Sequence, residues 1–263
     1  MASPDPSFKA IKYLPTKEAY DRWAAVYDTD GNFLQAMDDI EMQALLPRFE
    51  SALQMSKPWK LVDLGCGTGR NTALLLGVNG AQVIALDASE GMLAVAKKRL
   101  HELQSELMAA GALGEAGHKA HLQLAVFDLL ASDEPPASAT NADGVISTLV
   151  LEHIPLETFF RQASRLLKPG GVLLLTNMHA HMGGISQAGF VDMESGEKIR
   201  PTSYAHTVTD TIEEARKWGL VVDGEQGILE RQVTEDLVET LGPRSRKWVG
   251  VTCWFGGLFR KSW

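Results

Sequence analysis

Three glycines stand at alternate positions after a short apolar run: Gly65, Gly67 and Gly69 follow Leu61 to Leu64. The apolar run predicts a strand, and Arg70 to Leu76 has the periodicity of a helix. Glycines between a strand and a helix permit a tight turn and let a ligand approach the backbone. They also leave the helix N-terminal amides free for an anionic group. The pattern therefore indicates a ligand-binding turn.

The spacing of these glycines distinguishes two kinds of nucleotide ligand. The dinucleotide fingerprint of oxidoreductases needs its third glycine one position later, where this chain has Arg70. Asp87 ends the next predicted strand, where a carboxylate can accept hydrogen bonds from both hydroxyls of a ribose. A turn aspartate before Ser89 is the alternative. Together these residues favour a ligand that carries a ribose but no dinucleotide pyrophosphate.

Three stretches resemble one family. Asp63 to Gly69 resembles motif I of the class I S-adenosylmethionine-dependent methyltransferases, and Ser147 to Pro155 resembles their sequence after the fourth strand, which ends in Glu-His-Ile-Pro. Tyr20 to Asp28 resembles the N-terminal signature of methyltransferases related to those of quinone biosynthesis. The resemblance spans Tyr20 to the C-terminus, is strongest from Leu61 to Gly171, and implies S-adenosyl-L-methionine as the cofactor.

The resemblance also implies which residues bind the cofactor. Asp87 would hold the ribose, Met92 would pack on the adenine, and Asp128 would accept its exocyclic amine. Core packing for Met92 and a solvated strand end for Asp128 are the alternatives. Tyr20 and Trp23 would cover the sulfonium, or else pack on the core. The expected contacts are Tyr20, Trp23, Asp63, Gly65, Cys66, Gly67, Gly69, Asp87, Ala88, Met92, Phe127, Asp128, Thr148 and Leu149.

A general base is needed if the acceptor must lose a proton, and histidine is the side chain best suited near neutral pH. His153 follows the fourth predicted strand and His179 the fifth, both at the carboxyl edge where open α/β sheets bind ligands. His206 precedes a late helix, and His181 is a further candidate. We expect His153 first, although any of them could be structural, and positioning without a base could also suffice.

No metal site is expected. Asp128, Asp133 and Asp143 are available, but their spacing identifies no octahedral set of ligands. The two cysteines, Cys66 and Cys253, are too far apart in sequence to form a zinc knuckle or a disulfide framework, which favours a reducing, cytoplasmic location.

The composition of the chain disfavours some classes of methyl acceptor. The chain of 263 residues has 25 Lys and Arg against 33 Asp and Glu, and its formal charge of -8 disfavours nucleic acid and anionic membranes. No signal-peptide or membrane-spanning segment is expected. An Asn/Asp-Pro-Pro-aromatic motif of base and glutamine methylation is absent after the fourth predicted strand. We therefore expect a small-molecule acceptor. The alternatives are a protein or RNA methyltransferase and a catalytically silent binding protein.

Alternating apolar runs and helical periods predict a Rossmann-like α/β fold, with a doubly wound, mostly parallel seven-stranded sheet and an N-terminal helical cap. The first helix is expected to begin at a Thr16 cap and to run through Tyr27, and the second to extend from Phe33 to Leu46 and stop at Pro47. The expected strands are Lys60 to Leu64, Gln82 to Leu86, Leu122 to Phe127, Gly144 to Ser147, Val172 to Asn177, and two late strands within Leu220 to Ile228 and Val249 to Phe259. The later helices are expected at Arg70 to Leu76, Ser89 to Leu107, Leu156 to Leu167, Thr209 to Trp218 and Glu235 to Leu241.

One methyltransferase domain is expected over 1–263. It would comprise an N-terminal arm and helical cap (1–57), a cofactor-binding core (58–177), and a substrate loop with the C-terminal part of the sheet (178–263). Within the last part, Met178 to Tyr204 is polar, with scattered glycines, and predicts either a substrate loop or local disorder. Gly111 to Gly117 and Ser132 to Asn141 predict surface connections.

Overall fold

The computed structural model of the chain describes residues 11–53, 57–109 and 121–263. The expected N-terminal arm, Met1 to Ala10, and the expected loop at Gly111 to Gly117 lie outside the described residues.

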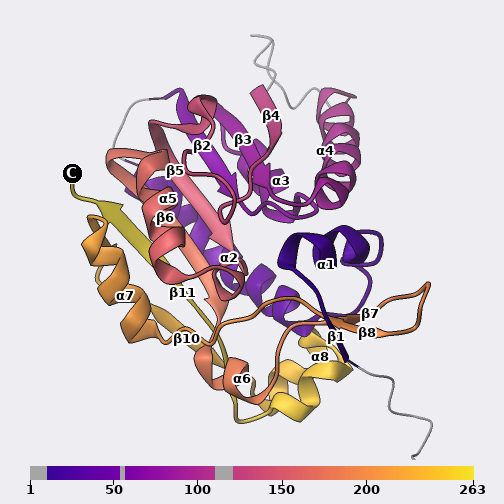
Figure 1. Ribbon diagram of the computed structural model, residues 1–263. Coiled ribbons are helices and arrows are strands. Elements are labelled where there is room, and N and C mark those ends of the chain that lie inside the picture. The colour runs from indigo at the N-terminus through magenta and orange to yellow at the C-terminus, as the bar shows by residue number, and fades with distance from the viewer. Residues whose placement is uncertain (1–10, 54–56, 110–120) are drawn as a thin grey trace, which may run out of the picture.

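A twisted, mostly parallel sheet forms the centre of the fold (Figure 1). Strand β2 pairs in parallel with β3 and β5, β4 lies outside β3, and β6 lies outside β5, where it pairs antiparallel with β11. Two short strands, β9 and β10, pair with successive parts of the far edge of β11. The expected doubly wound sheet is confirmed. Its eight strands occupy seven places across the sheet, because β9 and β10 lie end to end along the same edge of β11. The bounds are β2 Trp59–Leu64, β3 Ala81–Asp87, β4 His121–Val126, β5 Ala142–Thr148, β6 Leu167–Met178, β9 Leu220–Asp223, β10 Leu229–Gln232 and β11 Thr252–Lys261.

Helices cover both faces of this sheet because the side chains of a strand point alternately to opposite sides. Leu61 in β2 belongs to the core beneath α2, α3 and α4, whereas its neighbour Val62 belongs to the core beneath α5 and α7. The bounds are α2 Phe33–Ala52, α3 Arg70–Leu76, α4 Glu90–Ala109, α5 Leu156–Leu166, α7 Val208–Lys217 and α8 Val238–Leu241. Short 3-10 helices lie at Ala137–Ala139, Leu151–His153, Glu235–Leu237 and Pro243–Trp248. The core strands thus end in loops at one edge of the sheet.

A cap stands beside that edge, next to α4 (Figure 1). It combines α1 (Thr16–Trp23) with a small sheet of β1 (Ile11–Tyr13), β8 (Lys198–Arg200) and β7 (Phe190–Val191). Helix α6 (Ala180–Ile185) leads from β6 into this sheet. The expected substrate loop or disorder at Met178 to Tyr204 is thus a folded segment. It joins the N-terminal cap because Trp23 stacks on Phe190 at 4.8 Å between ring centroids.

The second helix does not end where the sequence predicted. Helix α2 continues through Pro47 to Ala52. A proline inside a helix removes one backbone hydrogen bond, but Leu45 and Phe49 on either side are fully buried. Tertiary packing of this apolar face therefore carries the helix past the proline.

The start and end of the first helix also differ from the expectation. Pro15, rather than Thr16, is the N-cap residue, and the Thr16 hydroxyl is buried without a hydrogen-bond partner. The helix ends at Trp23, so Tyr27 lies in the turns that follow. Tyr20, Trp23 and Tyr27 still contact one another, with ring centroids 5.1 to 5.8 Å apart, because the chain turns back at that point.

Candidate active site

The three glycines of the turn after β2 share a backbone conformation but differ in what surrounds them. All three have a positive φ, 76° at Gly65, 53° at Gly67 and 80° at Gly69, which favours glycine. A Cβ on Gly65 would overlap the Val150 side chain, and one on Gly69 would press on α4 at 3.1 Å from the Cβ of Ala96. A Cβ on Gly67 would meet no atom within 4 Å. Gly65 and Gly69 thus permit close packing, while the backbone at Gly67 faces open space.

Asp87 reaches across to this turn from the end of β3. Its carboxylate accepts hydrogen bonds from the backbone amides of Gly67, at 2.7 Å, and of Ser89, at 2.8 Å. Burial raises the pKa of Asp87 to about 6 in spite of these bonds. The sequence-based ribose role stays a prediction. The structure shows that the carboxylate holds two loops together at the site.

Asp63, the acidic residue of the same motif, is buried beneath the turn. Its Oδ2 accepts a hydrogen bond of 2.6 Å from the Thr72 hydroxyl, whereas Oδ1 is buried without a partner. Burial raises the pKa of this carboxyl to about 7. Nearby, the side-chain amide of Asn71 donates a hydrogen bond of 2.7 Å to the Thr148 hydroxyl, and its own Oδ1 has no partner. Unpaired buried acceptors are costly, so these two oxygens are suited to donors on a ligand.

Two aspartates attach the N-terminal cap to the two loops. Asp21 accepts hydrogen bonds from the Ser89 hydroxyl, at 2.6 Å, and from the Gly91 amide, at 3.1 Å. Asp28 accepts a hydrogen bond of 2.8 Å from the hydroxyl of Thr68 in the glycine turn, and it forms an ion pair of 2.7 Å with Arg99. The cap is therefore hydrogen-bonded to both sides of the expected cofactor site.

Tyr20 and His153 form the most direct polar pair of the site. The Tyr20 hydroxyl lies 2.7 Å from Nε2 of His153, and Nδ1 of His153 lies 2.6 Å from the carbonyl oxygen of Thr202. Because a carbonyl only accepts, Nδ1 carries the proton, and in the neutral ring Nε2 accepts from Tyr20. His153 is 2% exposed, and burial raises the pKa of Tyr20 well above its ordinary value. The pair is thus held in one orientation from behind.

A cavity opens in front of Tyr20. Its volume is about 120 Å³, below the roughly 300 to 1,000 Å³ of drug-sized pockets. Glu152 lines it, is 4% exposed and leaves Oε2 without a partner, and Oε1 lies 3.9 Å from Nε2 of His153. Burial raises the pKa of Glu152 above its ordinary value. The other lining residues are Trp23, Tyr27, Asp30, Asn32, Phe33, Leu34, Leu149, Met178, Met182, Ser186, Gln187, Ala188, Gly189, Lys198, Arg244, Lys247 and Trp248.

Leu149 lies at the border of this cavity with an unusual backbone. Its φ is 57°, a left-handed conformation that costs a non-glycine residue roughly 1–2 kcal/mol. Its amide donates a hydrogen bond of 2.9 Å to the carbonyl oxygen of Thr176. This bond stabilises the turn after β5. Such strain concentrates at functional sites. With Thr148 bonded to Asn71, both expected contacts from this strand end lie beside the glycine turn.

Other expected cofactor residues are placed less directly. Met92 is fully buried in a cluster with Ala19 and Trp23, so its side chain packs beneath the cap. The Asp128 carboxylate accepts 2.8 Å from the Leu130 amide, as a turn aspartate would. Phe127, Cys66 and Trp23 are buried, whereas Ala88 is half-buried beside Asp87. Their cofactor contacts stay predictions.

The other two histidines expected as bases, His179 and His206, do not line the cavity. His179 caps α6 by accepting from the His181 amide at 3.0 Å, and pairs with Glu230 at 3.0 Å. His206 lies 2.9 Å from the Ile154 carbonyl, stacks on Tyr204, and has its pKa lowered by burial. Each thus has a structural partner, and among these three candidates His153 alone is hydrogen-bonded to the cavity residue Tyr20.

Sequence reasoning missed three groups that the structure brings to this site. Glu152 precedes His153 in the Glu-His-Ile-Pro stretch, and Asp21 and Asp28 lie within the aromatic signature of the cap. Their position inside the matched motifs was the available signal. No group of three or more His, Cys, Asp or Glu residues within the described residues could hold a metal ion.

Comparison with known proteins gives a consistent result. A family model described as a methyltransferase domain matches residues 62–175. The chain is 51% identical to the uncharacterized methyltransferase AN0656 of Emericella nidulans, over 94% of this chain and 91% of that protein. It is 30% identical to the 2-phytyl-1,4-naphtoquinone methyltransferase of Synechococcus elongatus, over 61% of this chain and 62% of that protein. The phosphoethanolamine N-methyltransferase 2 of Haemonchus contortus shares the fold, with a TM-score of 0.61 at 19% identity over 95% of this chain and 61% of that chain.

Proposed function

Since the chain belongs to the class I S-adenosylmethionine-dependent methyltransferases, which transfer a methyl group to an acceptor by in-line displacement, we propose that the Tyr20 and His153 pair removes the acceptor's proton. We also propose that the acceptor of this enzyme is a small molecule. The observation that carries the proposal is the 2.7 Å bond from a cavity-lining hydroxyl to a buried imidazole.

The residues around the glycine turn fit the cofactor. A Cβ on Gly67 would project into open space, and Asp63 and Asn71 hold buried oxygens without donors. We propose that Asp87 binds the ribose hydroxyls, that the amides after Gly69 bind the carboxylate, and that Asp63 faces the amino group. When bound, S-adenosylmethionine supplies a sulfonium whose methyl group is transferred.

The proton of the acceptor then has a continuous path. The Tyr20 oxygen accepts the proton of the acceptor's O–H or N–H while its own proton moves to Nε2 of His153. The carbonyl of Thr202 holds Nδ1–H throughout, and Glu152, 3.9 Å from Nε2, stabilises the imidazolium. Bound S-adenosylmethionine would supply the methyl group, and the cavity residues would hold the deprotonated acceptor atom toward it. The protein contributes position, exclusion of water and proton removal.

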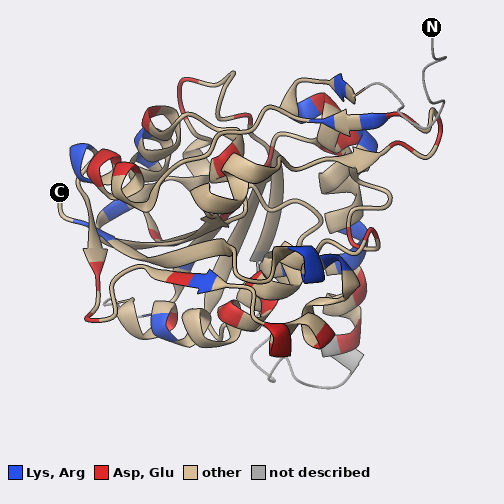
Figure 2. Ribbon diagram, turned by 90° about the horizontal axis from the view of Figure 1, so that it is seen from below, with Lys and Arg blue, Asp and Glu red and all other residues tan. Residues whose placement is uncertain are grey.

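Two observations support a small acceptor over protein or RNA. The cap and the segment from α6 to β8 supply much of the lining of the cavity, which limits access by a macromolecule. Acidic and basic segments alternate over the ribbon seen from below (Figure 2), whereas nucleic-acid binding needs a basic surface. We therefore propose that nucleic acid is not a substrate.

We also propose one domain and a cytoplasmic location. The part of the chain after residue 177 supplies β11 to the same sheet as the core at 58–177, and the cap at the N-terminus packs against α4. Both cysteines are buried and free, as a reducing compartment allows. None of the helices in the described ranges is long and apolar enough to span a membrane.

The test begins with calorimetry of the purified protein with S-adenosylmethionine, S-adenosylhomocysteine and NADH. We expect the two sulfur ligands to bind and NADH not to bind. A mass-spectrometric screen for methylated products then compares pools of metabolites, peptides and RNA. Methylation of RNA or peptides in place of metabolites would refute the small-molecule proposal, and tight binding of NADH alone would refute the cofactor assignment.

A further inference from the structure

Three cationic side chains stand on the lining of the cavity. Lys198 comes from β8, and Arg244 and Lys247 come from the 3-10 helix Pro243–Trp248. All three residues are exposed at their outer side. Two elements far apart in sequence thus bring positive charge to one opening, in a chain whose formal charge is -8.

These cations are mostly unneutralised. Within the described part of the chain, no carboxylate lies within 4.0 Å of the amino group of Lys198 or Lys247. Lys247 lies over the Trp248 ring, 5.3 Å from its centroid. Arg244 donates to the carbonyl of Asp30 and lies 4.0 Å from its carboxylate. The opening therefore carries a positive field that attracts an anionic group.

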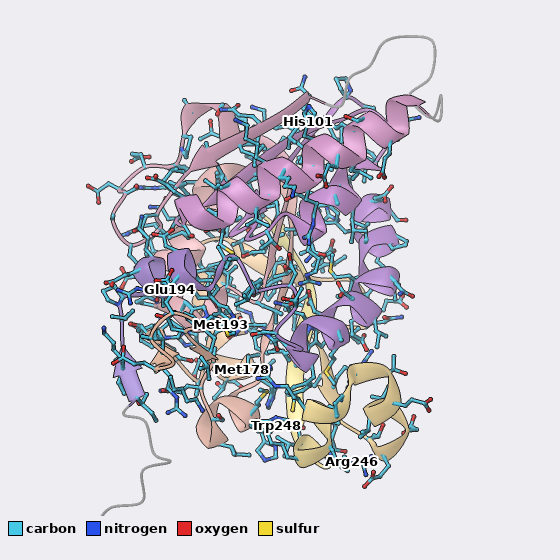
Figure 3. All side chains as sticks on the ribbon, turned by 90° about the vertical axis from the view of Figure 1, so that its right-hand side faces the viewer. His101, Met178, Met193, Glu194, Arg246 and Trp248 are labelled. Atoms are coloured by element: carbon cyan, nitrogen blue, oxygen red, sulfur yellow. The ribbon has the colours of Figure 1, made fainter. Side chains whose placement is uncertain are left out.

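The inner end of the cavity, at Glu152, needs a hydrogen-bond donor rather than an anion. Glu152 Oε2 is buried without a donor, although the side chain lines the cavity. Burial disfavours an unpaired carboxylate, and a ligand O–H or N–H would satisfy it. The lining also includes five large apolar side chains, Phe33, Leu34, Met178, Met182 and Trp248, beside the polar residues Asp30, Asn32, Ser186 and Gln187. Figure 3 shows Met178 and Trp248 in this region, with Arg246 farther out on the segment of Trp248.

We propose that the acceptor is an organic anion, with a carboxylate or phosphate at Lys198, Arg244 and Lys247 and a hydroxyl or amino group at the Glu152 end of an apolar body. This inference rests on the proposed function, because the inner group is the methyl acceptor. An amino group has one N–H for Glu152 and one for Tyr20, whereas a hydroxyl donates its single hydrogen to Glu152 on binding and turns it to Tyr20 for transfer. Arg244 suits a planar carboxylate or a phosphate because its guanidinium offers a fork of donors, whereas the lysines act as point charges.

Small aromatic probes test the two ends separately. We would titrate 4-hydroxyphenylacetate, its neutral amide 4-hydroxyphenylacetamide, and phenylacetate, which lacks the hydroxyl, into the protein saturated with S-adenosylhomocysteine. Ligand-observed NMR reports the affinity of each probe. A fourth probe, 4-hydroxybenzylphosphonate, compares a phosphorus oxyanion with a carboxylate. We expect the hydroxylated anions to bind about tenfold or more tighter than the amide and than phenylacetate.

Variants assign each preference to its residues. The double variant Lys198→Ala/Lys247→Ala should lose about tenfold in affinity for 4-hydroxyphenylacetate and leave the amide unchanged. Glu152→Gln should weaken the hydroxylated probes but not phenylacetate. Arg246→Ala is the matched control, since this exposed cation of the same 3-10 helix does not line the cavity.

The outcomes separate this inference from the proposed function. Equal binding of the anion and the amide in the wild type, or equal losses in Arg246→Ala and the double variant, would overturn the anionic acceptor. Binding of S-adenosylhomocysteine, measured in every variant, would still support the methyltransferase site in that case. Loss of that binding in the wild type would instead overturn the cofactor assignment.

Discussion

Tyr20 in the N-terminal cap and His153 after β5 share a hydrogen bond of 2.7 Å across 133 positions of sequence. The tyrosine faces the cavity, and the histidine lies behind it, fixed by the Thr202 carbonyl. The sequence predicted that Tyr20 shields the cofactor, and this hydrogen bond is the basis for placing Tyr20 in the proposed proton path. In the proposed mechanism, the almost fully buried His153 receives the acceptor's proton through Tyr20 and does not touch the acceptor itself.

Removing the Tyr20 hydroxyl should slow turnover and spare cofactor binding. With an acceptor from the metabolite screen, we expect Tyr20→Phe and His153→Ala each to lower kcat by about a hundredfold to ten-thousandfold. The double variant should be no slower than the worse single one, since the two groups act as a unit. Tyr27→Phe is the control, because Tyr27 also lines the cavity and contacts the Tyr20 ring but has no hydrogen bond to His153. Normal turnover of Tyr20→Phe would exclude the proposed proton path.

Asp87 should contribute to cofactor affinity beyond its role in the loops. Loss of its hydrogen bonds to ribose hydroxyls in Asp87→Ala should cost roughly 1.5 to 3 kcal/mol, about tenfold to a hundredfold in affinity for S-adenosylhomocysteine. Calorimetry measures this effect, with Glu90→Ala as the control because Glu90 is an exposed neighbour. Unchanged affinity in a folded Asp87→Ala protein contradicts the ribose assignment.

Two glycines of one turn should respond to alanine in different ways. Both have a positive φ, so each pays a similar backbone strain of about 1 kcal/mol. A Cβ at Gly65 also overlaps Val150, whereas one at Gly67 meets no protein atom within 4 Å. We expect Gly65→Ala to lower the melting temperature more, and Gly67→Ala to lower cofactor affinity more. Equal effects of the two variants on both measurements would argue against a ligand at Gly67.

Cofactor affinity should increase with pH. Burial raises the pKa of Asp63 to about 7 and of Asp87 to about 6, so both carboxyls take up protons as the pH falls through these values. A ligand that donates to the carboxylates binds less well there, and calorimetry between about pH 5 and about pH 8 should show the loss. In Asp63→Asn the upper part of the profile should be flat, and an unchanged profile would remove Asp63 from the site.

The same carboxyls act on folding with the opposite sign. Each native pKa lies above the ordinary value, so protonation stabilises the fold. This stabilisation is full below the unfolded pKa and is lost as pH rises through about 6 and about 7. The melting temperature of the free protein should therefore fall across this range, and less so in Asp63→Asn.

Asp38 should be among the most important polar groups for stability. Its fully buried carboxylate accepts 2.6 Å from Thr176, 3.0 Å from Trp254 and 2.8 Å from Arg70. Asp38→Ala leaves the Thr176 and Trp254 donors unpaired and removes one of the two carboxylates on Arg70, and we expect a loss of about 3–5 kcal/mol in the free energy of unfolding by urea. The exposed neighbour Asp39 also pairs with Arg70, yet Asp39→Ala should cost at most about 1 kcal/mol. Equal losses would contradict the role given to burial.

Local sequence patterns were sufficient for the core of the fold. The strands around the glycine turn and the helices α3, α4 and α5 lie within a few residues of their expected bounds, because apolar periodicity and glycine turns act over short stretches of chain. Long-range packing decided the exceptions. Helix α2 passes Pro47 because Leu45 and Phe49 are buried, and β10 adds to an edge that β11 provides.

By itself the sequence determined the family, the cofactor class and the position of the glycine turn, since these depend on residues close together in the chain. Only the tertiary structure decided which of the candidate histidines is hydrogen-bonded to a residue that lines the cavity. His153, His179 and His206 all lie near strand or helix ends, and the difference is that Tyr20 from the distant cap bonds to His153 alone among them. The same holds for the cationic opening, since Lys198 in β8 and Lys247 in the 3-10 helix Pro243–Trp248 line one cavity only in the folded chain. Such sites depend on side chains brought together by packing, which no local pattern records.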